Sequence, residues 1–531
     1  MSPVSPAPDE RRPLLNENHS IENVANSNWK LLVILSGVYL GGFTAALDST
    51  LVATLSGPIS ASFGSLPLLS WLASAYFIAT AVSQPLSGKL TDIYGRLPGL
   101  LLANAVFAIG NLICACSHSA SLLILGRVVA GIGGGGLAPI ASFVMSDLVP
   151  LRSRALWQGV GNICWGLGSG VGGYYGGLVN DTIGWRWAFI IQVPISVLAM
   201  VLVAINIRIP VEQSKGTKLE RIDVLGALAL VATMVLMLLG LSSAGNTVAW
   251  THPLVLTSLP LAAVFLFIFV LVEVRYAAEP IIPLRLFANR TVAAVCLTHF
   301  FSSMARFGLL FYGPIYFQVQ GYSPSQTGLR FIADSTGIGI TSLSCGIVVR
   351  STGRYLALGG LMQVIFLAGL GLIITLMLDT PPWPPFIYLF LVGVGFSGML
   401  TTTVVALVAS VEQKYQAVTT SASYACRSTG SVVGIAISGA IYQNVLKKGL
   451  WRRLGGLRDA KHLIEKVENN LRAMHDLDPD LERGIMQVHM YALRHVFFSL
   501  LAVAVLGAVS NGFVKEYKLY NTMARSEDAE E

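Results

Sequence analysis

The sequence has little charge. Asp, Glu, Lys and Arg make up 12% of its 531 residues, whereas soluble domains carry about 25%. Because 54% of the residues are hydrophobic, there are too few polar side chains to cover several soluble domains. Apolar runs of about 20 residues recur instead, the length that crosses roughly 30 Å of hydrocarbon. The sequence therefore predicts an all-α membrane protein that crosses the lipid bilayer many times.

Cysteine is also scarce. The six cysteines all fall inside apolar runs, and no loop contains a pair of them. Cysteines in such positions are typical of small core residues rather than of disulfides or metal ligands. The sequence thus predicts neither a metal site nor a cofactor.

The motifs of several function classes are missing. There is no HExxH sequence, no GxSxG sequence and no glycine loop that follows a strand to cradle a nucleotide. The formal net charge of +7 belongs to no basic soluble domain with interleaved aromatic residues. An enzyme and a nucleic-acid-binding protein are both unexpected.

Fourteen apolar runs can be counted along the chain. Lys and Arg concentrate in alternate short loops, while the short loops on the other side contain only Arg186. This bias predicts a cytosolic N-terminus. The predicted parts are a disordered cytosolic tail (1–28), a six-helix half (29–208), an extra helix pair with cytosolic linkers (209–290), a second six-helix half (291–514) and a cytosolic C-terminal tail (515–531).

One segment departs from the charge pattern. Residues 442–490 fall on the predicted non-cytosolic side, yet they contain many basic and acidic residues. Leu, Ile and Val recur at helical spacing between Leu457 and Val467. The prediction is a helical extramembrane loop that crosses as a unit.

A short charged sequence, GKLTDIYGRLP at Gly88–Pro98, lies between two apolar runs. The same spacing returns in the second half as GIVVRSTGRYL, Gly346–Leu356. Such repeats at corresponding places predict two related halves, a common transporter design. The candidate residues of the two loops are Gly88, Asp92, Gly95 and Arg96 in the first, and Gly346, Arg350, Gly353 and Arg354 in the second.

Several motifs together resemble one family. GKLTDIYGRLP resembles the loop motif between the second and third spans of the major facilitator superfamily, and GRVVAGIGGGG around Arg127 resembles its fourth-span arginine motif. LDST, at Leu47–Thr50, resembles the aspartate motif of the fourteen-span drug:proton antiporters. GSGVGGYYGGL resembles the fifth-span antiporter motif, with Gly168, Gly172, Gly173, Gly176 and Gly177 as its glycines. The resemblance implies the major facilitator fold.

Within that family the chain looks most like the fungal vacuolar basic amino acid transporters. It departs from the drug antiporters at Gly173, where proline is usual, at Leu97, where a second basic residue is common, and at Gln192, where Asn is frequent. The resemblance implies exchange of protons for lysine, arginine and histidine, moved from the cytosol into the vacuole. A drug or toxin exporter of the plasma membrane and a nutrient sensor that does not transport remain alternatives.

Three charged residues inside predicted spans are candidates for coupling protons to substrate. A carboxylate at the centre of a span costs about 2.5–3.5 kcal/mol, so such a group normally faces a cavity. Asp48 is predicted to hold a proton or a cationic substrate in turn, with Arg127 acting on a nearby carboxylate, and Asp334 is the candidate acid of the second half. The alternatives are an Asp48 near the far membrane face and an Arg127 that snorkels to the interface.

Other ionisable residues lie in or beside the spans of the second half. These are His299, Arg306, Arg330 and Arg427. A packing role is favoured for His299 over a proton relay.

The resemblance implies a conformational latch at the first glycine loop. Asp92 and Arg96 are expected to form a charge network with the end of another span, and Asp147 together with Arg154 is the candidate partner. A solvated loop with the usual excess of positive charge is the alternative. Because Arg350 stands where the first loop has Asp92, the two loops are not expected to be equivalent.

The N-terminal tail contains ERRPLL, in which Glu10 precedes Leu14 and Leu15 by four and five places. It resembles the acidic dileucine signals that adaptor complexes recognise when they send membrane proteins to vacuoles. A chance occurrence in a polar tail is equally compatible. The predicted location is the vacuolar membrane, with the plasma membrane as the alternative.

Overall fold

The computed structural model describes most of the chain. The described residues are 28–63, 68–149, 151–206, 223–244, 251–276, 284–322, 324–455 and 479–517, with Val248, Ile464 and Leu519. The predicted sorting signal at Glu10, Leu14 and Leu15 lies outside them, as do most of the predicted linkers of the 209–290 region.

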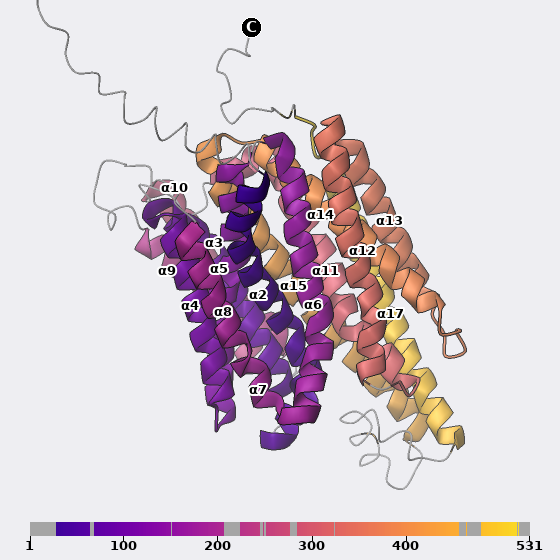
Figure 1. Ribbon diagram of the computed structural model, residues 1–531. Helices are drawn as coiled ribbons and strands as arrows, with labels where there is room; N and C mark the ends of the chain where they lie inside the picture. Colours follow the sequence, from indigo (N-terminus) through magenta and orange to yellow (C-terminus); the bar gives the residue numbers. More distant parts are fainter. Residues whose placement is uncertain are drawn as a thin grey trace, which may run out of the picture.

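The described chain is helical and divides into two bundles, drawn in indigo to magenta and in orange to yellow in Figure 1. The first bundle corresponds to the predicted N-terminal half. Its helices are α2 (Asn28–Phe63), α3 (Leu68–Tyr94), α4 (Arg96–Ala115), α5 (Ala120–Leu148), α6 (Leu151–Ile183), α7 (Trp185–Ile190) and α8 (Gln192–Asn206).

A further helix pair and the second bundle follow along the chain. The pair is α9 (Val224–Ser243) and α10 (Pro253–Arg275). The second half contains the short 3₁₀ helix η1 (Leu284–Ala288), α11 (Arg290–Val319), α12 (Pro324–Thr352), α13 (Leu356–Ile374), α14 (Pro384–Ala409), α15 (Gln413–Leu454) and α17 (Pro479–Asn511).

Fourteen helical segments of the described chain are long enough to span a membrane, if α7 and α8, which are interrupted only at Ile191, are counted as one. Twelve of them are also apolar enough by mean hydropathy. The other two, α3 and α6, carry many Ser, Thr, Gln and Gly residues. The predicted all-α membrane fold is confirmed, and the fourteen segments agree with the predicted number.

The two halves meet along two helix pairs. Helix α6 packs against α12 on one side of the molecule, and α3 packs against α15 on the other. Helix α9 contacts both α3 and α15, and α10 packs on α9. Ala229, Leu230 and Phe269 of this pair pack with Leu86 of α3. The extra helices therefore cover the α3–α15 side of the interface between the halves.

Residues 442–490, predicted as an extramembrane loop, include the ends of two long helices. Helix α15 continues to Leu454 and α17 begins at Pro479, so both ends of this segment belong to long helices. The stretch from Leu457 to Val467, for which helical spacing was predicted, lies outside the described residues apart from Ile464. Leu446 and Leu450 of α15 are buried with Ile485 of α17 in the core of the second half, so apolar contacts hold the extensions together.

The two glycine loops are shorter than predicted. Helix α3 runs to Tyr94 and α4 starts at Arg96, so Gly95 alone separates them. Gly88 and Gly346 are buried within α3 and α12. The residues predicted to form the two loops therefore lie largely in the ends of long helices, which tight turns connect.

Candidate functional site

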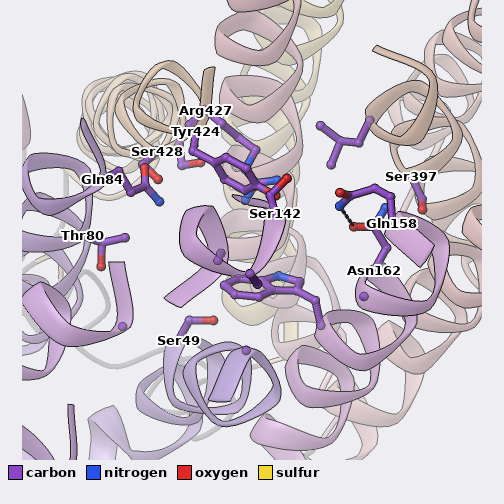
Figure 2. Close-up of a pocket in the computed structure, with 18 of the residues that line it drawn as sticks. Ser49, Thr80, Gln84, Ser142, Gln158, Asn162, Ser397, Tyr424, Arg427 and Ser428 are labelled. Carbon is purple, nitrogen blue, oxygen red and sulfur yellow. Dashed lines mark hydrogen bonds between the residues drawn. The ribbon is translucent and has the colours of Figure 1, made fainter. Parts of the chain in front are cut away.

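A cavity of about 120 Å³ lies between the two halves. Helices α2, α3, α5 and α6 line it from one side, and α11, α12, α14 and α15 from the other. Aromatic residues contribute much of the wall, including Tyr76, Trp157 and Tyr424. Figure 2 shows the polar side chains around it: Ser49, Thr80, Gln84, Ser142, Gln158, Asn162, Ser397, Tyr424, Arg427 and Ser428.

Asp48 of α2 and Arg127 of α5 form an ion pair beside this cavity. Arg127 Nη1 lies 2.7 Å from Asp48 Oδ2, and the two side chains are 1% and 0% exposed. Arg127 also lies over the ring of Tyr76, 4.3 Å from the ring centroid. The structure therefore brings together two of the three residues that were candidates for proton coupling, and it places Arg127 inside the bundle rather than at an interface.

Glycines of the antiporter motif set the position of α2. A Cβ at Gly168 of α6 would overlap the carbonyl oxygen of Phe43, and one at Gly172 would overlap that of Leu47. Only glycine permits this approach, which holds α6 against α2 next to Asp48. Gly176 is buried, Gly173 is half-buried, and Gly177 faces open space. The contribution of the motif to packing at Asp48 thus lies at Gly168 and Gly172.

The Asp48–Arg127 pair is sealed from the cavity. Neither residue is among those that line the cavity, although Ser49 and Tyr76 are. Gln192 of α8 covers the pair from the other side, with its Nε2 atom 3.5 Å from Asp48 Oδ1. A substrate in this cavity does not touch Asp48 in this conformation, so the predicted direct exchange of proton and substrate at Asp48 needs a rearrangement.

The second half contains its own ion pair. Arg306 Nη2 of α11 lies 2.6 Å from Asp334 Oδ2 of α12, and both side chains are 8% exposed. Arg306 lines the cavity and lies over the ring of Phe396, 4.8 Å from its centroid. The candidate acid of this half is thus bound to an arginine at the cavity wall.

The other ionisable candidates of the second half, His299, Arg330 and Arg427, lie in three different surroundings. His299 Nε2 lies 2.8 Å from Thr403 Oγ1 in a buried contact between α11 and α14, in keeping with a packing role. Arg330 lies over the ring of Tyr322 at 3.7 Å and donates to the Gln326 carbonyl. Arg427 of α15 alone among the three lines the cavity.

The predicted latch residues of the first half form a network at the predicted cytosolic end. Arg96 Nη1 lies 2.6 Å from Asp92 Oδ1, and its Nε atom lies 2.8 Å from Asp147 Oδ2 at the end of α5. Burial raises the pKa of Asp92, and the guanidinium of Arg96 opposes that shift. This network ties the α3–α4 turn to α5.

Arg154 is close to this network but makes different bonds. It donates to the backbone carbonyls of Ser146 and Val149 instead of pairing with Asp147. Its Nη1 atom also lies 3.0 Å from Oε1 of Gln416 in α15. Arg154 therefore closes the end of α5 and joins the first half to the second.

The corresponding turn of the second half is held in another way. The Tyr355 amide donates to Glu516 Oε1 at 3.1 Å, and the Tyr517 amide donates to the Tyr355 hydroxyl at 2.6 Å. The start of the predicted C-terminal tail is therefore packed against this turn. Among the described residues, Arg354 forms no ion pair with a carboxylate within 4.0 Å, unlike Arg96 of the first turn.

Several contacts of the candidate site could not be predicted from the sequence. Gln416 lies in no motif, and Tyr355 lies in the second glycine motif without being a candidate residue; their partners lie 262 and 161 residues away in the chain. Tyr76 belongs to α3, whereas Arg127, the charged residue that its ring covers, belongs to α5. A signal was available only for Gln192, which stood out as a departure from the family pattern and which contacts Asp48.

Comparisons with known proteins agree with this arrangement. Residues 38–435 match the family described as the Major Facilitator Superfamily. The chain is 33% identical to the multidrug resistance protein fnx1 of Schizosaccharomyces pombe, over 95% of this chain and 96% of that protein. It is 32% identical to the vacuolar basic amino acid transporter 1 of Saccharomyces cerevisiae, over 96% of each.

Solved structures show the same fold. A bacterial homologue of the human lysosomal transporter Spinster, in an inward-facing and unoccupied conformation, matches with a TM-score of 0.59 and 16% identity. That match covers 94% of this chain and all of the bacterial one. The human organic anion transporter MFSD10 matches with a TM-score of 0.57 and 14% identity, over 89% of this chain and 99% of that one. The chain therefore belongs to the major facilitator superfamily, a family of membrane transporters and not of enzymes.

Proposed function

We propose that this transporter is a proton antiporter that moves basic amino acids such as lysine, arginine and histidine from the cytosol into the vacuole. The observation that carries the proposal is the buried Asp48–Arg127 pair beside the central cavity. A carboxylate inside a membrane protein is costly and marks an ion or proton pathway. The names of the relatives supply the substrate class.

Coupling works through the charge of Asp48. When Asp48 is ionised, its bond to Arg127 holds α2 against α5. A proton that arrives from the acidic side neutralises the carboxylate and weakens the ion pair, which frees α2 to move. Because Ser49 and Gly42 of α2 line the cavity, this movement changes the cavity wall. Loss of the proton to the cytosol restores the pair. Each pH unit across the membrane supplies about 1.4 kcal/mol per proton, so a few units drive accumulation.

The latch network fits alternating access. Arg96 links the α3–α4 turn to α5, and Arg154 bridges from α6 to Gln416 of the second half. Both contacts lie at the predicted cytosolic end. The Arg154–Gln416 bond joins the two halves and must break when they separate on that side, while the Arg96 network keeps α3, α4 and α5 of the first half together as it moves.

A multidrug exporter of the plasma membrane is the second candidate. The relative fnx1 is named a multidrug resistance protein, and the aromatic cavity wall suits flat apolar compounds as well as cations. The same Asp48–Arg127 pair would couple either substrate class. Location separates the two: with Leu14 and Leu15 changed to Ala, a tagged vacuolar protein is expected to move to the plasma membrane.

Uptake by vacuolar vesicles tests the proposal. Vesicles that carry the protein should accumulate labelled lysine, arginine or histidine when ATP acidifies them. A protonophore should abolish the uptake, and Asp48→Asn should lower it to the level of vesicles without the protein. Uptake that survives the protonophore would show that protons do not drive the transport.

A further inference from the structure

The central cavity carries an excess of positive charge. Arg306 and Arg427 both line it, and none of the described lining residues is Asp or Glu. Asp334 neutralises Arg306 at 2.6 Å from just behind the wall. Within the described chain, Arg427 makes no ion pair with a carboxylate. One guanidinium at the cavity wall therefore lacks a counter-charge.

An aromatic neighbour holds the guanidinium of Arg427 at the cavity wall. Its guanidinium lies over the ring of Tyr424, 4.2 Å from the centroid, which holds the side chain on one side of the cavity. Figure 2 shows Arg427, Tyr424 and Ser428 on one flank, away from the hydrogen-bonded Gln158 and Asn162. An arginine presents its donors in a planar fork that matches a carboxylate.

Two further polar atoms of the cavity lack partners. Gln84 Oε1 and Ser142 Oγ are buried and have no hydrogen-bond partner among the described residues. Both residues line the cavity and are labelled in Figure 2. Buried polar groups without partners are costly, so a ligand or water is expected to satisfy them. Gln84 Oε1 accepts hydrogen bonds only, and it suits an ammonium group.

We propose that Arg427 binds the carboxylate of the substrate, so that the transporter takes molecules with both a carboxylate and an ammonium group and rejects bare organic cations. This inference rests on the proposed transport of amino acids and defines how they are recognised. The aromatic faces of the wall and Gln84 accept the ammonium groups. A dication without a carboxylate finds no acidic side chain in the described cavity wall and faces the free charge of Arg427.

Lysine and cadaverine, its decarboxylated analogue, provide the test. The full-length protein in proteoliposomes with an acidic interior takes up labelled lysine, and unlabelled compounds compete. Lysine is expected to compete at least about tenfold better than cadaverine or lysine methyl ester, a difference of about 1.4 kcal/mol. Arg427→Gln should raise the KM for lysine about tenfold and strengthen the weak competition by cadaverine, because the positive charge that repels the dication is gone, and Arg427→Lys should give a KM between the two.

Matched controls make the result specific. Arg494→Gln removes an exposed arginine of α17 that lies over Phe498, and it should leave the preference for lysine over cadaverine unchanged. Fluorescence-detected gel filtration checks that each variant folds. Should Arg427→Gln not fold, the comparison of lysine with its methyl ester and with cadaverine on the unchanged protein still decides, because both analogues lack the carboxylate charge while they differ in size and in the α-ammonium group.

The outcomes separate this proposal from the one on which it rests. If the protein takes up lysine while cadaverine or the ester competes equally well, the carboxylate site is wrong and amino acid transport stands. If Arg427→Gln keeps the full preference for lysine, the site is wrong as well. If the protein takes up none of the basic amino acids, both proposals fail.

Discussion

The two halves of the molecule bury similar ion pairs in different surroundings. In the first half, Asp48 and Arg127 are 0% and 1% exposed, and the pair is shut off from the cavity. In the second half, Arg306 and Asp334 are each 8% exposed, and Arg306 forms part of the cavity wall. Under the proposed mechanism, the first pair would respond to protons away from the substrate, and the second would shape the cavity wall that the substrate meets.

The turns that follow the second helix of each half differ in a similar way. Charged side chains hold the first turn, where Arg96 bonds to both Asp92 and Asp147. Backbone and tyrosine hydrogen bonds to the C-terminal segment hold the second turn, through Tyr355. Both turns therefore contain a glycine of positive φ, while different side-chain contacts hold each turn.

The largest effect is expected at Asp48. Asp48→Asn leaves Arg127 buried without a counter-charge, which costs roughly 3–5 kcal/mol of stability, and transport should be lost. Adding Arg127→Met removes the stranded charge and should restore most of the thermal stability without restoring uptake. Thermal unfolding and vesicle uptake measure the two properties separately. If the double variant transports normally, the pair is structural only.

The next effect is expected at Asp334. Asp334→Asn should cost less stability than Asp48→Asn, since the freed Arg306 can face the cavity. The added positive charge at the wall should raise the KM for lysine about tenfold, with a smaller change in the maximal rate. Uptake measured over a range of lysine concentrations separates the two parameters. An equal loss of stability at both positions would remove the distinction between the two pairs.

A smaller effect should separate the two turns. Asp92→Ala removes one of the two ion pairs of Arg96 and should slow transport about tenfold, whereas Arg350→Ala should slow it less than about twofold. Partly exposed ion pairs contribute up to about 1 kcal/mol each, so neither variant should unfold the protein. Initial uptake rates, normalised to the amount of protein, provide the measurement. Equal rates for the two variants would contradict the asymmetry.

The sequence predicted the class of fold, because apolar spans of fixed length depend only on local composition. It also identified Asp48, Arg127 and Asp92 as candidates, since charge inside or between spans is rare. It could not predict that Arg127 meets Asp48, because these residues are 79 positions apart and meet only when α2 packs on α5. The length of α15 was missed because a helix can continue past the apolar run that marks its span.

The smallest effect tests what the two turns share. Gly95 has φ = 100° and Gly353 has φ = 71°, values that disfavour any residue with a Cβ. Their amides donate to the carbonyls of Thr91 and Val349, four residues earlier, and so end α3 and α12 alike. Gly95→Ala and Gly353→Ala should each cost about 1–2 kcal/mol and lower the unfolding temperature by similar amounts. A Cβ at Gly353 would meet nothing within 4 Å, so the cost there comes from the backbone alone. A clearly larger loss at Gly95 would mean that the Arg96 network depends on that turn, and the asymmetry would then extend from the side chains to the backbone.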